Sequence, residues 1–131
     1  RLVKNSVWSQ KGNFCDIPTD CTTRERAGWT GDMGVFIETG LTLMDCYPVA
    51  EKWLAECRLN QYPDGRMANI APPNARPGYM TPMLCMSAGW GDAAILVPYA
   101  LYKRTGDRKI LADNYEMMQR LSLIHISEPT R

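Results

Sequence analysis

The stretch "DCYPVAEKWLAECRLNQ", residues 45–61, is the segment that most clearly decides the fold. Asp45 can cap the amino end of a helix, and Pro48 suits the first turn because its missing N–H would have no intrahelical partner there. Helical spacing then places four apolar side chains in one stripe: Val49, Trp53, Leu54 and Cys57. The sequence therefore predicts an amphipathic helix with this face buried.

Helical spacing also recurs on both sides of this segment. Before it, residues 34–44 predict a helix despite Gly40. The side chains at helical intervals there are Val35, Phe36, Thr39 and Leu43. After it, a further helical segment is indicated by Trp90, Ala93, Ala94, Val97 and Leu101. Pro98 must kink this segment or split it into two pieces.

A last helix follows Gly106, which ends the preceding one, and Asp107 caps it. Its inward side chains are expected to be Ile110, Leu111, Tyr115 and Met118. Residues 62–66 read as a turn, and residues 71–82, with their prolines, read as a loop. Residues 1–10 are poorly patterned and suggest a helix end. Because no alternating strand pattern is present, the sequence predicts an all-α fold of four to six helices.

The composition excludes several classes of partner. The chain has 131 residues, is 45% hydrophobic and 22% charged, and carries a net charge of +1. These values indicate one domain. Without a basic block, a nucleic-acid partner or an anionic membrane surface is not expected. No apolar run approaches the roughly 18 residues that a membrane helix requires. The sequence does not indicate an oligomeric state.

Five cysteines are scattered along the chain: Cys15, Cys21, Cys46, Cys57 and Cys85. None forms a C-x-x-C pair, and His125 is the only histidine, so neither a structural zinc site nor any other metal or cofactor is expected. Scattered thiols favour a reducing compartment such as the cytoplasm, without fixing the compartment. Each cysteine can also be read as a small buried hydrophobe.

The chemically richest segment is "PTDCTTRERAGWTGD", residues 18–32, whose proline and two glycines predict a shaped loop rather than a helix. Glu25 has a carboxylate on either side in sequence, Asp20 and Asp32, and Trp29 follows four residues later. Burial and neighbouring negative charge favour a protonated acid, which acid–base hydrolysis needs. An indole beside carboxylates also suits a sugar, whose C–H face it covers while the carboxylates bind hydroxyls.

Other interpretations of this segment remain open. Arg24 and Arg26 would oppose protonation of Glu25 if they were close, or could orient the aspartates or a sugar hydroxyl. The segment could equally be a solvated ion-pair loop with a core tryptophan. A calcium loop starting at Asp20 fits poorly, since it would need glycine at residue 25 and glutamate at residue 31.

A second tryptophan–aspartate pair, Trp90 and Asp92, lies in "GWGDAAILVPYALYKRTGD", residues 89–107. Each residue also has a structural interpretation, Asp92 as a helix N-cap and Trp90 at the edge of the core.

Taken together, "IPTDCTTRERAGWTGD", "EKWLAECRLNQYPDGR" and "GWGDAAILVPYALYKRTGD" resemble the catalytic domain of bacterial α-L-rhamnosidases, from about residue 13 to residue 120. The resemblance implies part of an (α/α)6 barrel of six helical hairpins and an inverting hydrolysis of L-rhamnose-containing glycosides. It implies that Glu25 is the general acid. The sugar-binding positions it implies are Asp20, Arg24, Trp29, Asp32, Trp90 and, less directly, Asp92.

The chain departs from the family pattern in two respects. Thr22 stands where family members often have proline, which bears on the stiffness of the loop. The second carboxylate of an inverting glycosidase lies roughly 6.5–9.5 Å from the acid. In the family it comes from a glutamate beyond the end of this chain, so this fragment is expected to be inactive.

The last eleven residues, "LSLIHISEPTR" at 121–131, resemble the translation of a transposase adapter used in sequencing libraries. We therefore expect residues 1–120 to be a partial glycosidase domain and residues 121–131 to be read-through. A loose, strand-like tail is the alternative.

Two rival functions remain at this point. One is a six-hairpin glycosidase for another sugar. The other is a non-catalytic helical module whose carboxylate and tryptophan loops bind a carbohydrate or a partner protein.

Overall fold

The computed structural model describes residues 1–73, 87 and 89–127, and among these it contains five helices and no strand. The helices are α1 (Leu2–Asn13), α2 (Thr30–Leu43), α3 (Tyr47–Leu59), α4 (Ala93–Thr105) and α5 (Lys109–Ser127). The all-α prediction is thus confirmed for this part of the chain. Residues 74–82 of the predicted loop, Cys85 and residues 128–131 lie outside the described residues.

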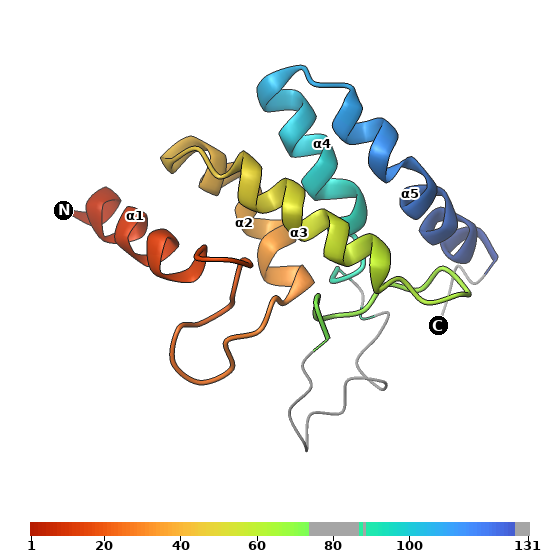
Figure 1. The fold of residues 1–131 in the computed structure, drawn as a ribbon, viewed down its shortest axis with the longest axis horizontal. Coiled ribbons are helices and arrows are strands. Elements are labelled where there is room, and N and C mark those ends of the chain that lie inside the picture. The colour runs from red at the N-terminus through yellow and green to blue at the C-terminus, as the bar shows by residue number, and fades with distance from the viewer. Residues whose placement is uncertain (74–86, 88, 128–131) are drawn as a thin grey trace.

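The helices form a curved row with α1 at one end and α5 at the other (Figure 1). Helix α2 packs along α4, α4 packs against α5, and α3 lies against both α4 and α5, while α1 contacts α2. The core between them is made by large buried side chains from four helices and the segment before the loop: Met33, Ile37, Trp53, Leu54, Met67, Val97, Leu101, Ile110 and Leu121. Burial of these apolar surfaces holds the row together.

Helix α3 matches its prediction closely. The N-cap residue is Cys46, one residue later than predicted, and the Asp45 carboxylate before it accepts the backbone N–H of Tyr47 at 3.2 Å. Pro48 lies in the first turn as predicted. Trp53, Leu54 and Cys57 are buried as predicted, and Val49 is half-buried. The turn at residues 62–66 is also confirmed, with the N–H of Gly65 donating to the carbonyl of Tyr62 at 2.8 Å.

The amino-terminal third is more helical than the sequence indicated. Residues 2–13 form a complete helix, and the side-chain amide of buried Gln10 donates to the carbonyl of Gly40 at 3.2 Å, which ties α1 to α2. Helix α2 starts at Thr30, so the last three residues of the predicted loop are helical. The buried face of α2 also differs from the predicted spacing, because Val35 is 82% exposed. The buried residues are Thr30, Met33, Gly34, Ile37, Gly40 and Leu41.

Helix α4 runs through Pro98 without being split. A proline in the second turn removes a single intrahelical hydrogen bond, a loss that the buried apolar face of this helix offsets. Gly106 ends the helix as predicted, in the left-handed conformation with φ +74°, and its N–H donates to the carbonyl of Tyr102 at 2.7 Å. The Asp107 carboxylate then accepts the N–H of Lys109 at 2.8 Å, which confirms its capping role.

The predicted inward face of α5 is partly wrong, since Tyr115 is 58% exposed. A polar side chain replaces it: Asn114 is fully buried, accepts Arg58 Nη1 at 2.7 Å and donates to the carbonyl of Ile110. Spacing of apolar residues could not reveal a buried interhelical amide. Helix α5 also continues past residue 120, with Leu121 buried, so residues 121–127 are not a loose tail. Their origin as read-through stays a prediction.

A short backbone pairing anchors the glutamate-bearing loop to the segment after the 62–66 turn. Residues 28–30 and 69–71 run antiparallel, with Thr30 N–H donating to Asn69 at 2.8 Å and Ala71 N–H donating to Gly28 at 2.9 Å. The carbonyl of Ala71 in turn accepts the indole N–H of buried Trp53 at 2.8 Å. The pairing therefore sets where the loop ends and where α2 begins.

Only glycine fits at residue 28, because a Cβ there would lie 2.2 Å from the carbonyl oxygen of Ala71. We expect Gly28→Ala to separate the paired segments and to lower the free energy of unfolding by about 1–3 kcal/mol, the usual cost of overpacking. Urea denaturation followed by tryptophan fluorescence measures this change.

Gly12→Ala is the matched control, since its Cβ would make only an ordinary contact of 3.5 Å with Thr22 in an exposed part of α1. It should stabilise the chain by about 0.5–1 kcal/mol, the usual helix preference for alanine. Equal effects of the two substitutions would contradict the close approach at Gly28.

Candidate active site

The loop before α2 is closed at its base by a double hydrogen bond between Asp20 and Ala27. The N–H of Asp20 donates to the carbonyl of Ala27, and the N–H of Ala27 donates to Asp20 Oδ1, both at 3.1 Å. Within the closed segment, Arg26 adopts a left-handed conformation with φ +53°, which is unfavourable for a side chain of this kind. The loop is therefore a defined turn that holds its tip in place.

Both carboxylate oxygens of Glu25 are bound within this loop. Oε2 accepts the indole N–H of Trp29 at 2.8 Å, and Oε1 accepts Nη2 of Arg24 at 2.6 Å. The Glu25 side chain is 21% exposed, whereas that of Arg24 is 85% exposed. An ion pair with so exposed a partner is weak, so the hydrogen bond from the Trp29 indole contributes more to holding the Glu25 carboxylate in place. The backbone N–H of Glu25 is also bound, since it donates to Cys21 Sγ at 3.1 Å.

Trp90 brings the second tryptophan–aspartate pair to the start of α2. A Cβ at Gly31 would lie 2.8 Å from atoms of the Trp90 ring, so the indole rests directly on this glycine. Trp90 is 37% exposed. Two indoles therefore flank the first turn of α2, one before it at Trp29 and one against it at Trp90.

Asp92 occupies the N-cap position of α4, as its structural interpretation predicted, but its side chain makes no capping hydrogen bond. The residue is half-buried. Its position two residues after Trp90 is fixed by the start of α4, and capping chemistry does not account for its carboxylate.

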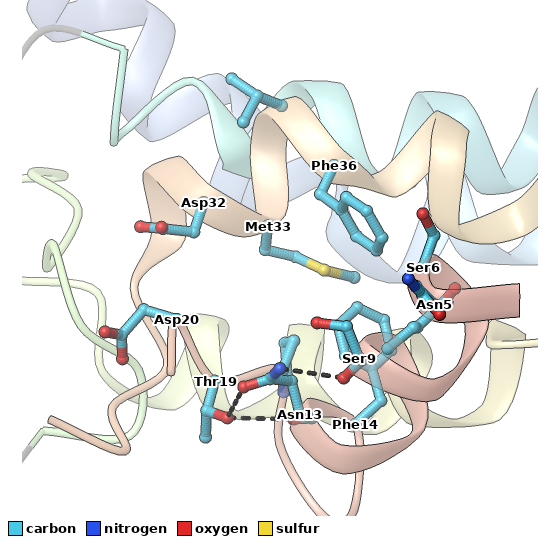
Figure 2. A pocket seen from close by; sticks show the side chains of 13 residues that line it. Asn5, Ser6, Ser9, Asn13, Phe14, Thr19, Asp20, Asp32, Met33 and Phe36 are labelled. Carbon is cyan, nitrogen blue, oxygen red and sulfur yellow. Dashed lines mark hydrogen bonds between the residues drawn. The ribbon is translucent and has the colours of Figure 1, made fainter. Parts of the chain in front are cut away.

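A cavity of about 540 Å³ lies between α1 and α2, beside the loop (Figure 2). Asp20 and Asp32 stand at one end of it, and Met33 and Phe36 contribute an apolar wall. The opposite wall comes mainly from α1 and the residues after it and mixes Phe14 and Pro18 with polar side chains, those of Asn5, Ser6, Ser9, Gln10, Asn13 and Thr19. Glu25 and Trp29 do not line this cavity, so it adjoins the loop through the two aspartates.

The carboxylates of the loop are close enough to influence one another. The pKa of Asp32 is raised above its ordinary value, chiefly by partial loss of solvent around the group and further by repulsion from Asp20 and Glu25, while a backbone hydrogen bond opposes the rise. Asp32 as a whole residue remains exposed. Because the charges of Asp20 and Glu25 both act on the pKa of Asp32, these three acidic side chains form one cluster.

The structure thus brings most of the predicted site residues together. The residues grouped around the loop and the first turn of α2 are Asp20, Arg24, Glu25, Trp29, Asp32 and Trp90. Sequence reasoning missed Cys21 as a hydrogen-bond acceptor and the polar side chains in that wall of the cavity. The spacing of Asn5, Ser9 and Asn13 would have indicated that wall had residues 2–13 been predicted as a helix.

Among the described residues, no group of three or more histidine, cysteine, aspartate or glutamate side chains is arranged to hold a metal ion. The helices of that same part of the chain include none with the length and apolarity needed to cross a bilayer.

We expect the Asp32 pKa to fall when Asp20 is changed to asparagine, because one source of repulsion is removed while the side-chain oxygen that accepts the Ala27 N–H is kept. The fall should be partial, since desolvation is the larger cause. Carboxyl-detected NMR titration measures this pKa. Asp45→Asn, beyond the far end of α2, is the control and should leave it unchanged.

The pH dependence of stability follows from the same shift. The native state binds the Asp32 proton more tightly than the unfolded chain does, so the contribution of this group to stability is greatest below its ordinary pKa. That contribution is lost as the pH rises through the pKa of Asp32 in the native state.

An Asp32 pKa that is insensitive to Asp20→Asn would contradict the grouping of Asp20, Glu25 and Asp32 in one cluster.

Comparison with known proteins places these features in a family. The sequence model of the bacterial α-L-rhamnosidase six-hairpin glycosidase domain matches residues 1–129. An α-L-rhamnosidase of Formosa agariphila is 41% identical over 121 residues, which are 92% of this chain and 12% of that protein. One from Streptomyces avermitilis is 43% identical over 114 residues, covering 86% of this chain and 10% of that protein.

Solved structures agree with this match. The Streptomyces avermitilis α-L-rhamnosidase complexed with L-rhamnose superposes with a TM-score of 0.79 at 38% identity, over 91% of this chain and 12% of that one. The α-L-rhamnosidase of Aspergillus terreus gives a TM-score of 0.78 at 36% identity, over 91% of this chain and 13% of that one. The chain therefore spans about a tenth of the length of its relatives, and its helices form part of an α/α barrel. It belongs to the bacterial α-L-rhamnosidase six-hairpin glycosidase family.

Proposed function

We propose that a complete enzyme carrying this segment hydrolyses terminal α-L-rhamnosides with inversion, and that Glu25 is the proton donor. The observation that carries the proposal is the Glu25 carboxyl, bound by the Trp29 indole N–H at 2.8 Å within a cluster that includes Asp20 and Asp32. The match to α-L-rhamnosidases, one of them complexed with L-rhamnose, supports the choice of sugar.

In the proposed reaction the protonated Glu25 gives its proton to the glycosidic oxygen while the bond from that oxygen to the anomeric carbon breaks. A water molecule attacks the anomeric carbon from the opposite face and loses a proton to a second carboxylate. The water oxygen thus replaces the leaving group with inversion. The hydrogen bond from Trp29 holds one oxygen of Glu25, so the other is the one that would carry the transferable proton.

The remaining residues would bind the sugar. Arg24 is exposed enough to exchange its contact with Glu25 for a hydroxyl of the substrate. Asp20 and Asp32 supply acceptors at the end of the cavity, and the exposed part of Trp90 offers an apolar face for the C–H groups of a pyranose. Asp92 is proposed as a more distant contact beyond Trp90.

The decisive experiment is to assay the complete enzyme on an alkyl α-L-rhamnoside, whose basic leaving oxygen needs a proton, beside its Glu25→Gln variant. Loss of the proton donor should lower kcat by about 10²–10⁴-fold, the usual contribution of general acid catalysis. Glu38→Gln is the matched control, because Glu38 is an exposed carboxylate on α2 that pairs with Lys103 at 2.8 Å. Wild-type activity in Glu25→Gln would remove Glu25 from this role.

The 131-residue chain by itself should release no p-nitrophenol from p-nitrophenyl α-L-rhamnoside. The proposed mechanism requires a second carboxylate across the sugar, and the resemblance assigns that group to a segment downstream of this chain. Turnover by the isolated chain that Glu25→Gln abolishes would show that its own residues supply the base.

A further inference from the structure

Cys21 differs from the other described cysteines in what its sulfur contacts. Cys46 and Cys57 are buried at 1% and 2% exposure, and burial raises the pKa of both thiols, as expected of thiols that serve as core hydrophobes. Exposed Cys15 donates to carbonyl groups of the preceding helix α1, those of Lys11 and Gly12. The half-buried Cys21 instead accepts the backbone N–H of Glu25 at 3.1 Å.

This contact lies inside the turn that the Asp20–Ala27 double hydrogen bond closes. The base of the turn is fixed by that pair, and the tip is fixed by the Trp29 indole on the Glu25 carboxylate. Between base and tip, the sulfur holds the main chain of Glu25 itself. The unfavourable φ of +53° at Arg26 directly follows Glu25, so this stretch of backbone needs restraint from its neighbours.

The indole and the sulfur act on opposite ends of the same residue. The indole fixes where the carboxyl oxygen lies, and the sulfur fixes where the chain that bears it lies. If the main chain of Glu25 moves, the carboxyl must either lose the indole or change its rotamer. A displacement of about 1 Å at a reacting group can cost up to about a hundredfold in rate.

We propose that Cys21 is a positioning residue for Glu25, and that its sulfur acts as a hydrogen-bond acceptor. The inference rests on the proposed role of Glu25 as proton donor. It requires an acceptor at residue 21, and the thiol's reactivity plays no part in it. Serine, whose oxygen can accept the same N–H, should therefore replace the cysteine, and alanine should not.

The kinetic test uses the complete enzyme with Cys21→Ala, Cys21→Ser and the control Cys15→Ala, assayed on an alkyl α-L-rhamnoside, whose leaving oxygen depends on the proton donor. Cys21→Ala should lower kcat by about tenfold with KM within twofold, because the acid is misplaced while the sugar contacts remain. Cys21→Ser should recover most of kcat, and Cys15→Ala should match the wild type. Unchanged kcat in Cys21→Ala, or equal losses in the alanine and serine variants, would overturn the proposal.

A spectroscopic readout separates this inference from the function on which it rests. The indole N–H resonance of Trp29, assigned with Trp29→Phe in the complete enzyme, reports the hydrogen bond to Glu25. It should move in Cys21→Ala and stay near its wild-type position in Cys21→Ser. A moved resonance together with full activity of Glu25→Gln would refute Glu25 as the proton donor but would still show that Cys21 positions the Glu25 carboxyl. An unmoved resonance together with an inactive Glu25→Gln would support Glu25 as the proton donor and refute the positioning role of Cys21.

Discussion

The backbone pairing of residues 28–30 with residues 69–71 is the constraint on which the rest of the arrangement depends. It joins the loop that carries Glu25 to the segment that follows α3, and the indole of Trp53 secures it from the core through the carbonyl of Ala71. Because Trp29 lies in the middle of this pairing, its indole is presented from a fixed backbone. The hydrogen bond to Glu25 is thus anchored to the packed helices rather than to a free loop.

This arrangement divides the work between elements. The helices supply burial, and the loop before α2 supplies charged groups, whose positions are set by hydrogen bonds to its own main chain. Such a division is expected where a rigid scaffold presents reactive groups on loops. It also concentrates the acidic side chains, since Asp20, Glu25 and Asp32 fall within one turn and the first turn of α2, and the raised pKa of Asp32 is the electrostatic consequence.

The sequence predicted the parts of the structure that depend on local chemistry. Helix α3 and the stop at Gly106 follow from residues acting on adjacent backbone, and both were confirmed. The N-cap of α3 is Cys46, and Asp45 binds the first helical N–H from one residue earlier. One position of the inward face of α5 was mispredicted: Tyr115 is exposed, and the buried neighbour is Asn114, whose burial depends on reaching Arg58 of a different helix. The packing of the Trp90 indole against Gly31 likewise joins residues far apart in the sequence, and no local sequence pattern indicates it. The grouping of charged residues in the loop was predictable, whereas the acceptor role of Cys21 required the turn itself.

The most direct test of the account is the dependence of kcat/KM on the leaving group in a complete enzyme with Glu25→Gln. A missing proton donor matters most when the departing oxygen is strongly basic, and least when it leaves readily as an anion. The account predicts a large loss on an alkyl α-L-rhamnoside and a much smaller one on 2,4-dinitrophenyl α-L-rhamnoside. Equal losses on both substrates would contradict proton donation by Glu25.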